Sequence, residues 1–232
     1  MQPSGENMSI KIYIDSGDWG VITKYLTQVD GITTNPTLLR NAGATQYQDT
    51  VRWLLNCAGG KPISLEVVGD DLTEMEEEAR GLSKNGENVY VKIPITNSKG
   101  ESTNNLIRKL SVNGIKLNIT AVMTLNQIRT AAGALYRETP SIISIFAGRI
   151  ADTGRDPVPF FSAGLQAKHA KTELLWASAR EVYNVKQAEQ AGADIITLSP
   201  ALIDKIKLFG KDLAEYSLET VRQFFEDGKT LR

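Results

Sequence analysis

A single lysine inside an apolar segment is the residue that most suggests chemistry. Lys92 lies within residues 88–96, and the residues on the opposite parity are all aliphatic: Val89, Val91, Ile93 and Ile95. In a sheet covered on both sides, the face that carries Lys92 is also interior. A buried ammonium group is costly unless it is paired or has lost its proton. A lysine with a depressed pKa is a nucleophile suited to Schiff-base formation. On this segment alone, a structural ion pair or a lysine at a sheet edge is the simpler interpretation.

Polar residues recur where other apolar segments end, which favours a functional site over a structural lysine. They are Asp15, Thr33, Thr34, Asn35, Glu66, Asn118, Thr120, Ser144, Arg149, Ser178 and Arg180. Each has a structural alternative: Asp15 and Ser178 could cap helices, Asn35–Pro36 could begin one, and Glu66 could simply pair with Lys92. Polar residues at seven successive strand ends are harder to explain in this way, because buried polar groups cost free energy.

The set has the chemical groups for an amine nucleophile, acid–base catalysis and anion binding. Arg149 and Arg180 with Ser178 suit a phosphate, and a helix predicted to begin at Ala179 would add backbone N–H donors. The only histidine, His169, and the only cysteine, Cys57, provide neither a metal cluster nor a Ser-His-Asp triad. We therefore expect no metal and no cofactor.

Alternating strand-like and helix-like segments indicate the scaffold. The predicted strands span Ile10–Asp15, Gly31–Thr34, Pro62–Val68, Val89–Ile95, Ile115–Ala121, Ser141–Phe146, Glu173–Ala177 and Asp194–Leu198, and helical patterns between them include Asp71–Leu82, Thr124–Tyr136, Ala179–Ala191 and Ser199–Leu208. Eight such repeats predict an α/β fold, a (β/α)8 TIM barrel whose chemistry gathers at the carboxyl ends of the strands. An open doubly wound sheet is the alternative, although no G-x-G-x-x-G motif follows any strand.

Three regions are expected along the 232 residues. Residues 1–9 are polar and predicted to be a flexible extension, residues 10–210 form the barrel, and residues 211–232 hold an extra amphipathic helix over about Lys211–Asp227. That helix could cover a barrel mouth or pack on a neighbouring subunit. A formal net charge of -1 gives no indication of a nucleic-acid or membrane partner. Without a signal-peptide pattern, the cytoplasm is the default location.

Two motifs resemble the transaldolase family, which includes the small fructose-6-phosphate aldolases. Residues 30–38, Asp-Gly-Ile-Thr-Thr-Asn-Pro-Thr-Leu, are similar to its signature, and the lysine of Val91–Pro94 lies on the fourth strand as in that family. Deoxyribose-phosphate aldolase resembles this chemistry but has its lysine on a later strand. The similarity extends from about Ile10 through the C-terminal helix.

The resemblance implies a role for each matching residue. Lys92 would form the Schiff base with a ketose, Asp15 would take the C4 hydroxyl proton, and Glu66 with Thr120 and a water would handle protons during dehydration. Substrate would be held by a wider set, comprising Thr34, Asn35, Asn118, Ser144, Phe146, Arg149, Ser178 and Arg180, and we expect Trp176, which departs from the family, to line the same pocket. The resemblance also implies sugar-phosphate substrates and a ring-like homo-oligomer, such as a pentamer or decamer, in which the C-terminal helix packs on a neighbour.

Two positions distinguish transfer of a dihydroxyacetone unit from its release. Glu66 and Phe146 resemble transaldolases, whereas the aldolase branch has Gln and Tyr there. We therefore expect a transaldolase, with an aldolase that releases dihydroxyacetone as the alternative. Trp176 departs from the usual small residue, and strand parity with Ser178 predicts that it points into the pocket. Because this indole would narrow the pocket, a modified donor such as a sulfonated sugar is an alternative substrate. A non-catalytic sugar-phosphate binding protein is disfavoured, because Lys92, Asp15 and Glu66 are all present.

Overall fold

The computed structural model describes residues 10–231, so the predicted extension over residues 1–9 lies outside the described part. Its strands are β1 (Lys11–Asp15), β2 (Gly31–Thr33), β3 (Ile63–Glu66), β4 (Val89–Pro94), β5 (Leu117–Val122), β6 (Ser141–Ile145), β7 (Thr172–Trp176) and β8 (Ile195–Leu198). All pair in parallel and in chain order, and β8 closes on β1 through pairs such as Tyr13 with Thr197. This closure confirms the (β/α)8 barrel and excludes the open doubly wound sheet.

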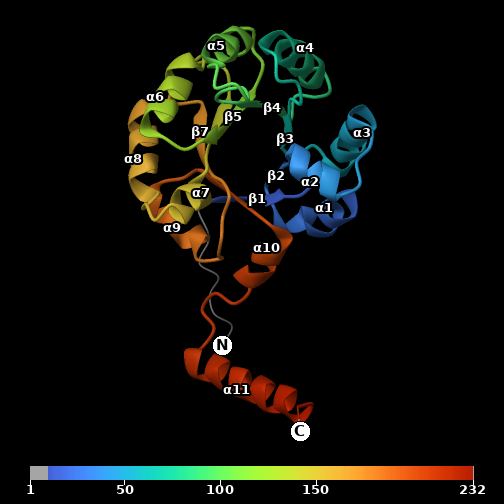
Figure 1. The fold of residues 1–232 in the computed structure, drawn as a ribbon, viewed down its shortest axis with the longest axis vertical. Helices are drawn as coiled ribbons and strands as arrows, with labels where there is room; N and C mark the ends of the chain where they lie inside the picture. The colour runs from blue at the N-terminus through green and yellow to red at the C-terminus, as the bar shows by residue number, and fades with distance from the viewer. Residues whose placement is uncertain (1–9, 232) are drawn as a thin grey trace.

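Helices surround the barrel, with α11 set apart from it, as Figure 1 shows. They are α1 (Trp19–Tyr25), the short 3₁₀ helix η1 (Leu26–Gln28), α2 (Pro36–Asn41), α3 (Tyr47–Ala58), α4 (Leu72–Ser83), α5 (Asn104–Val112), α6 (Leu125–Ala134), α7 (Ala147–Asp152), α8 (Val158–Ala167), α9 (Asn184–Ala191), α10 (Pro200–Ile206) and α11 (Leu213–Lys229). Local sequence explains several ends. Thr124 and Gln127 form a capping box at α6, and Gly192 ends α9 in the left-handed region.

One predicted helix begins later than expected. The pattern over Ala179–Ala191 predicts a helix from Ala179, but α9 begins at Asn184. Ser178 adopts a positive φ of 64°, and the Asn184 side chain accepts hydrogen bonds from the backbone of Arg180 and Glu181. These contacts stabilise a loop over residues 178–183. The expected backbone donors of a helix start at Ala179 are therefore absent.

The apolar core has two layers. A small cluster fills the barrel interior and consists of Tyr13, Ile142, Leu175, Ala177 and Ile195. A much larger cluster lies between the barrel wall and the helices, and includes Ile14, Ile32, Leu65, Val91, Ile93, Ile119, Ile143, Ile145, Trp176, Ile196 and Leu198. Alternate residues of each strand belong to opposite layers, as the two-residue period requires. Lys92 therefore faces inward while Val91 and Ile93 face the helices.

The C-terminal helix α11 is separate from the barrel. Figure 1 shows it beyond α10, projecting away from the other elements. None of its residues is buried, and it exposes Leu213, Tyr216, Leu218, Val221, Phe224 and Phe225. The extra helix is present as predicted, and it does not cover a mouth of its own barrel.

Candidate active site

A cavity of about 570 Å³ lies at the carboxyl ends of the strands, where barrel chemistry is expected. Most of the predicted site residues line it. From that set, the lining includes Asp15, Asn35, Glu66, Lys92, Thr120, Ser144, Phe146, Arg149, Ser178 and Arg180. The seven strands and their following loops thus bring residues up to 165 positions apart in sequence (15 to 180) into one pocket.

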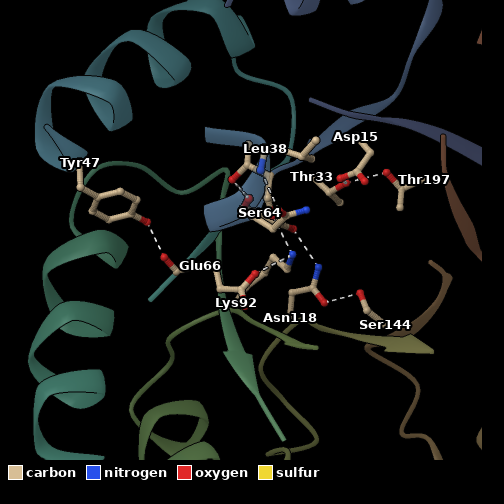
Figure 2. Close-up of polar contacts among 12 residues, drawn as sticks. Asp15, Thr33, Leu38, Tyr47, Ser64, Glu66, Lys92, Asn118, Ser144 and Thr197 are labelled. Atoms are coloured by element: carbon tan, nitrogen blue, oxygen red, sulfur yellow. Dashed lines mark hydrogen bonds and ion pairs between the residues drawn. The ribbon is translucent and has the colours of Figure 1, made fainter. Parts of the chain in front are cut away.

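Lys92 is held on the floor of this cavity by two oxygens. Its ammonium lies 3.0 Å from Glu66 Oε2 and donates a 2.7 Å hydrogen bond to the backbone oxygen of Thr34. Only 6% of the residue is exposed. Figure 2 shows Glu66 and Lys92 side by side, with Tyr47 donating to the backbone oxygen of Glu66. The ion pair considered as a structural alternative is therefore present, and it aims the amine at a carboxylate that can accept its proton.

Asp15 lies across the pocket with a perturbed acidity. Burial raises the pKa of the Asp15 carboxyl above its ordinary value, and the negative charge of Glu66 adds to that rise. The Lys92 charge and a 2.7 Å hydrogen bond from Thr33 Oγ1 act in the opposite direction but only partly offset it. Asp15 can thus hold or release a proton nearer to neutral pH than an exposed aspartate, as general acid–base chemistry requires.

Neutral polar groups form a fixed network beside Lys92. Ser144 Oγ donates to Asn118 Oδ1 at 2.6 Å, and Asn118 Nδ2 donates to Ser64 Oγ at 3.0 Å. All three side chains are buried. These bonds fix the amide orientation of Asn118 and leave its second N–H as a donor. Ser64 was missed from the sequence because it lies two residues before Glu66, one layer below the strand end.

Thr120 carries an unused hydroxyl. Among the described residues, its buried Oγ1 is one of three side-chain polar atoms without a hydrogen-bond partner. The next residue, Ala121, adopts a positive φ of 58°, where the pairing of β5 with β6 is irregular. An unpartnered buried hydroxyl that borders a cavity is suited to bind a water or a substrate atom.

The two arginines lie together at the rim. Arg149 is 5.7 Å from the Phe146 ring centroid, and Arg180 forms a two-pronged ion pair with Asp152, with Nε 3.1 Å from Oδ1. The Arg180 guanidinium holds the pKa of Asp152 below its usual range. Asp152 was not predicted from the sequence, because no strand pattern precedes it. It neutralises part of the positive charge and orients the Arg180 fork.

A tight backbone contact positions the loop that carries Ser178 and Arg180. A Cβ atom on Gly148 would lie 1.6 Å from the backbone oxygen of Ser178, so the first turn of α7 approaches the Ser178 loop as only glycine allows. The Gly148 N–H also donates to the Ala177 backbone oxygen at 3.3 Å. The contact places Arg149 and Arg180 on adjoining segments of the same rim.

Three residues predicted to contact substrate do not line the cavity: Asn118, which is buried in the network beside Lys92, Thr34, and Trp176, which is the clearest correction. Its side chain is 1% exposed, stacks on Phe161 of α8 with ring centroids 4.9 Å apart, and belongs to the layer between barrel and helices. Leu175 and Ala177 face the pocket instead. The parity rule failed because Ser178 has a left-handed backbone, which interrupts the strand alternation that linked it to Trp176.

Thr34 is the second correction. Its side chain is fully buried and donates to the Ser64 backbone oxygen, away from the cavity. Its contribution is the carbonyl that accepts from Lys92. Asn35 lines the cavity, but its Oδ1 also caps α2 by accepting from the Leu38 N–H at 3.0 Å, the structural alternative foreseen for it.

No cluster of three or more metal-ligating side chains occurs among residues 10–231, and no helix in that range is long and apolar enough to cross a membrane. The arrangement is instead a buried amine beside a carboxylate, with a second carboxylate and an arginine pair around one cavity. This combination suits amine catalysis on an anionic carbonyl substrate.

Sequence comparison identifies the family. The sequence model described as "Transaldolase/Fructose-6-phosphate aldolase" matches residues 12–232. The chain belongs to the transaldolase/fructose-6-phosphate aldolase family. It is therefore an enzyme of the transaldolase/aldolase type, and the resemblance seen in its motifs is confirmed.

Relatives of this family member are named as probable transaldolases. One from Methanococcus maripaludis is 35% identical over 202 residues, covering 85% of this chain and 89% of its own. One from Nitrosopumilus maritimus is 34% identical, covering 85% and 87%. "Probable transaldolase 2" of Listeria monocytogenes is 33% identical, covering 85% and 88%.

Solved structures agree on the fold alone. The 3-hexulose-6-phosphate synthase of Salmonella typhimurium superposes with a TM-score of 0.58 at 16% identity, covering 83% of this chain and 90% of that one. At so low an identity, the similarity to this transaldolase/aldolase family member extends to the barrel and not to the reaction.

Proposed function

We propose that this enzyme is a class I transaldolase, which transfers a dihydroxyacetone unit from a ketose phosphate to an aldose phosphate through a Schiff base on Lys92. Fructose 6-phosphate and sedoheptulose 7-phosphate are the donors of the expected kind. The observation that carries the proposal is the buried Lys92 amine, 3.0 Å from the Glu66 carboxylate and in one cavity with Asp15.

Schiff-base formation requires an uncharged amine. Glu66 accepts a proton from Lys92, and the Lys92 Nζ then attacks the ketose carbonyl carbon to give a carbinolamine. Glu66, with a water held by the free hydroxyl of Thr120, returns the proton so that water leaves and an iminium forms. Asn118, Ser144 and the amide nitrogen of Asn35 hold the hydroxyls of the three-carbon unit.

Cleavage of the carbon–carbon bond uses the opposite wall of the pocket. Asp15 takes the proton of the C4 hydroxyl, the C3–C4 bond breaks, and its electron pair moves into the iminium to give an enamine. The aldose product leaves, and an acceptor aldose takes its place. Asp15 then returns the proton as the new bond forms. The raised pKa of Asp15 supports both directions, because the group must hold the proton between the two half-reactions.

Arg149, Ser178 and Arg180 are proposed to bind the phosphate of donor and acceptor. All three line the same cavity as Lys92. Because Asp152 occupies one edge of the Arg180 guanidinium, Arg149 supplies the less compensated charge. A sulfonated sugar stays an alternative on this anion site. Trp176 gives it no support, since its side chain lies outside the pocket.

Transfer is preferred over release because of Glu66 and Phe146. Phe146 lines the cavity with no hydroxyl that could order a water near the enamine. An aldolase that releases dihydroxyacetone is the second candidate. Release needs a proton donor at the enamine carbon, and an apolar ring at this position disfavours it.

We also propose that α11 packs on another copy of this chain. Six large apolar side chains of this helix are exposed, and isolated helices with such faces are poorly stable in water. A self-association through α11 would bury them and form the homo-oligomer that the family resemblance implies.

The deciding experiment is release of glyceraldehyde 3-phosphate from fructose 6-phosphate, with and without erythrose 4-phosphate. A transaldolase gives sustained release only with the acceptor. Sustained release of dihydroxyacetone without an acceptor would establish the aldolase instead. Absence of release in both conditions, together with no borohydride-trapped adduct, would contradict the Schiff-base proposal for this donor.

A further inference from the structure

A pair of threonine hydroxyls links Asp15 to β8, the strand that closes the barrel on β1. Thr33 Oγ1 lies 2.7 Å from Asp15 Oδ1 and 2.6 Å from Thr197 Oγ1. Figure 2 shows the three side chains in a row, separate from the Lys92 group. They come from β1, β2 and β8, which are paired neighbours in the closed barrel, with Asp15 opposite Thr33. Barrel closure is therefore what brings Thr197 to this row.

The hydrogen-bond directions follow from proton counting. Thr33 has one hydroxyl proton, and an ionised Asp15 can only accept, so Thr33 donates to Asp15. Thr197 must then donate to the Thr33 oxygen. Thr197 is 5% exposed and lines the cavity, so water competes little for this proton. Each donation polarises the next, which strengthens the bond that reaches the carboxylate.

We propose that Thr197 is a positioning residue for the general base, acting through Thr33 to hold Asp15 Oδ1 and leave Oδ2 for the substrate hydroxyl. The inference rests on the proposed transaldolase function and assigns a residue that no strand-end pattern had singled out. Thr197 lies on β8, the one strand from which no polar residue was selected.

The electrostatic surroundings of Asp15 set the direction of the expected effect. The titratable groups that act on it are Lys92, which favours its charge, and Glu66, which opposes it. Neither changes when Thr197 is altered. The hydrogen bond from Thr33 also favours the ionised form, so a weaker bond raises the pKa of Asp15 further. The base form needed for carbon–carbon cleavage then appears at higher pH.

The test uses Thr197→Val, which keeps the shape and removes the hydroxyl, with Thr197→Ser as the conservative rescue. Thr139→Val is the matched control. Thr139 precedes β6 at its amino-terminal end, is also buried, and donates a 2.7 Å hydrogen bond to the Ser111 backbone oxygen. Two readouts are taken: the pH profile of kcat for cleavage of fructose 6-phosphate in the presence of acceptor, and borohydride trapping of the adduct on Lys92.

We expect Thr197→Val to move the acidic limb of the kcat profile upward by about 0.5 to 1 pH unit. We also expect kcat at neutral pH to fall roughly 3- to 10-fold, with trapping on Lys92 unchanged. Thr197→Ser and Thr139→Val should stay within about 2-fold of the wild type.

An unshifted acidic limb in folded Thr197→Val would overturn the inference, as would an equal loss in Thr139→Val. If Thr197→Val does not fold, Thr197→Ala removes the same hydroxyl without adding bulk and is judged by the same limb. A wild-type protein that neither traps substrate nor turns over would instead contradict the proposed function, so the two failures are distinguishable.

Discussion

At the scale of single residues, the two carboxylates of the pocket have different neighbours. Glu66 lies beside the Lys92 ammonium, whereas Asp15 accepts a hydrogen bond from the Thr33 hydroxyl, and burial raises the pKa of Asp15. Two acids with different surroundings can take different proton-transfer roles in one reaction. This division is the residue-level basis for assigning Glu66 to Schiff-base formation and Asp15 to bond cleavage.

Replacement of the amine tests the nucleophile directly. Lys92→Arg keeps a positive charge beside Glu66 but cannot form an iminium, so turnover should fall by at least about 10³-fold. Borohydride treatment with substrate should give no mass increase in this variant. Lys168→Arg is the control, because Lys168 is another partly buried lysine, 2.6 Å from Asp194, that does not line the cavity. Normal turnover of Lys92→Arg would refute the nucleophile assignment.

The ionised Asp15 side chain should lower the free energy of unfolding at neutral pH. The folded protein holds the Asp15 proton more tightly than the unfolded chain, because burial raises the pKa of this carboxyl above its ordinary value. Native Asp15 therefore makes the free energy of unfolding fall as the pH rises from the unfolded pKa through the raised folded pKa. Asp15→Asn removes this dependence and should be more stable at neutral pH by about 0.5–2 kcal/mol, while losing activity.

Chemical denaturation at several pH values measures this effect. The gain in Asp15→Asn should vanish below the unfolded pKa, where Asp15 is protonated in both states. The Asn side chain still offers an oxygen to Thr33, so the hydrogen bond is a matched feature. A variant that is less stable than the wild type at neutral pH would contradict the linkage.

At the scale of elements, the rim proposed to bind the anion depends on two backbones in close contact. The first turn of α7 and the loop after β7 approach so closely that a Cβ on Gly148 meets the Ser178 oxygen at 1.6 Å. The positive φ of Ser178 turns this loop toward the pocket and leaves Trp176 in the helix layer. The geometry of Arg149 and Arg180 is thus set by how the two segments pack.

Gly148→Ala should disturb this rim. We expect a loss of roughly 2 kcal/mol or more in stability, because neither backbone can move freely. We also expect KM for phosphorylated substrates to rise. Borohydride trapping of the adduct on Lys92 should change less. Gly133→Ala in α6 is the control, since nothing lies within 4 Å of its added Cβ, and it should gain about 0.5–1 kcal/mol. Equal KM values in Gly148→Ala and the wild type would show that the contact does not position the anion site.

At the scale of the whole molecule, the barrel packs its own apolar faces, but the apolar face of α11 stays exposed. The barrel buries its own core, whereas α11 has no buried residue in the single chain. Helices in proteins are stabilised mostly by packing of an apolar face, so this helix requires a partner surface. A second copy of the chain is the proposed partner.

Charge placed on the apolar face of α11 should break this association. Phe224→Glu is expected to lower the molar mass measured by light scattering after size-exclusion chromatography, because a buried carboxylate is costly in an interface. Gln223→Glu, which adds the same side chain at the neighbouring polar position, should keep the mass of the wild type. A wild type that is monomeric at micromolar concentration would contradict the proposal.

The sequence by itself determined the barrel, the inward direction of Lys92 and most of the pocket. Periodicity reports which face of a strand a side chain occupies, and parallel strands align their carboxyl ends, so Asp15, Glu66, Thr120 and Ser144 could be grouped without coordinates. Strand alternation does not hold across a residue with a left-handed backbone. The prediction that Trp176 shares a face with Ser178 was therefore wrong. The Ser178 backbone lies directly against Gly148, and that contact is not local in sequence.

Tertiary structure alone decided the contacts between distant segments. The Asp152–Arg180 pair and the Thr197–Thr33–Asp15 row depend on loop paths and on closure of β8 onto β1. No one-dimensional pattern encodes which neighbours a closed sheet creates. Residue types and spacing therefore indicate which groups are proposed to react. Their hydrogen-bond partners, and so their acidity, follow from how the barrel closes.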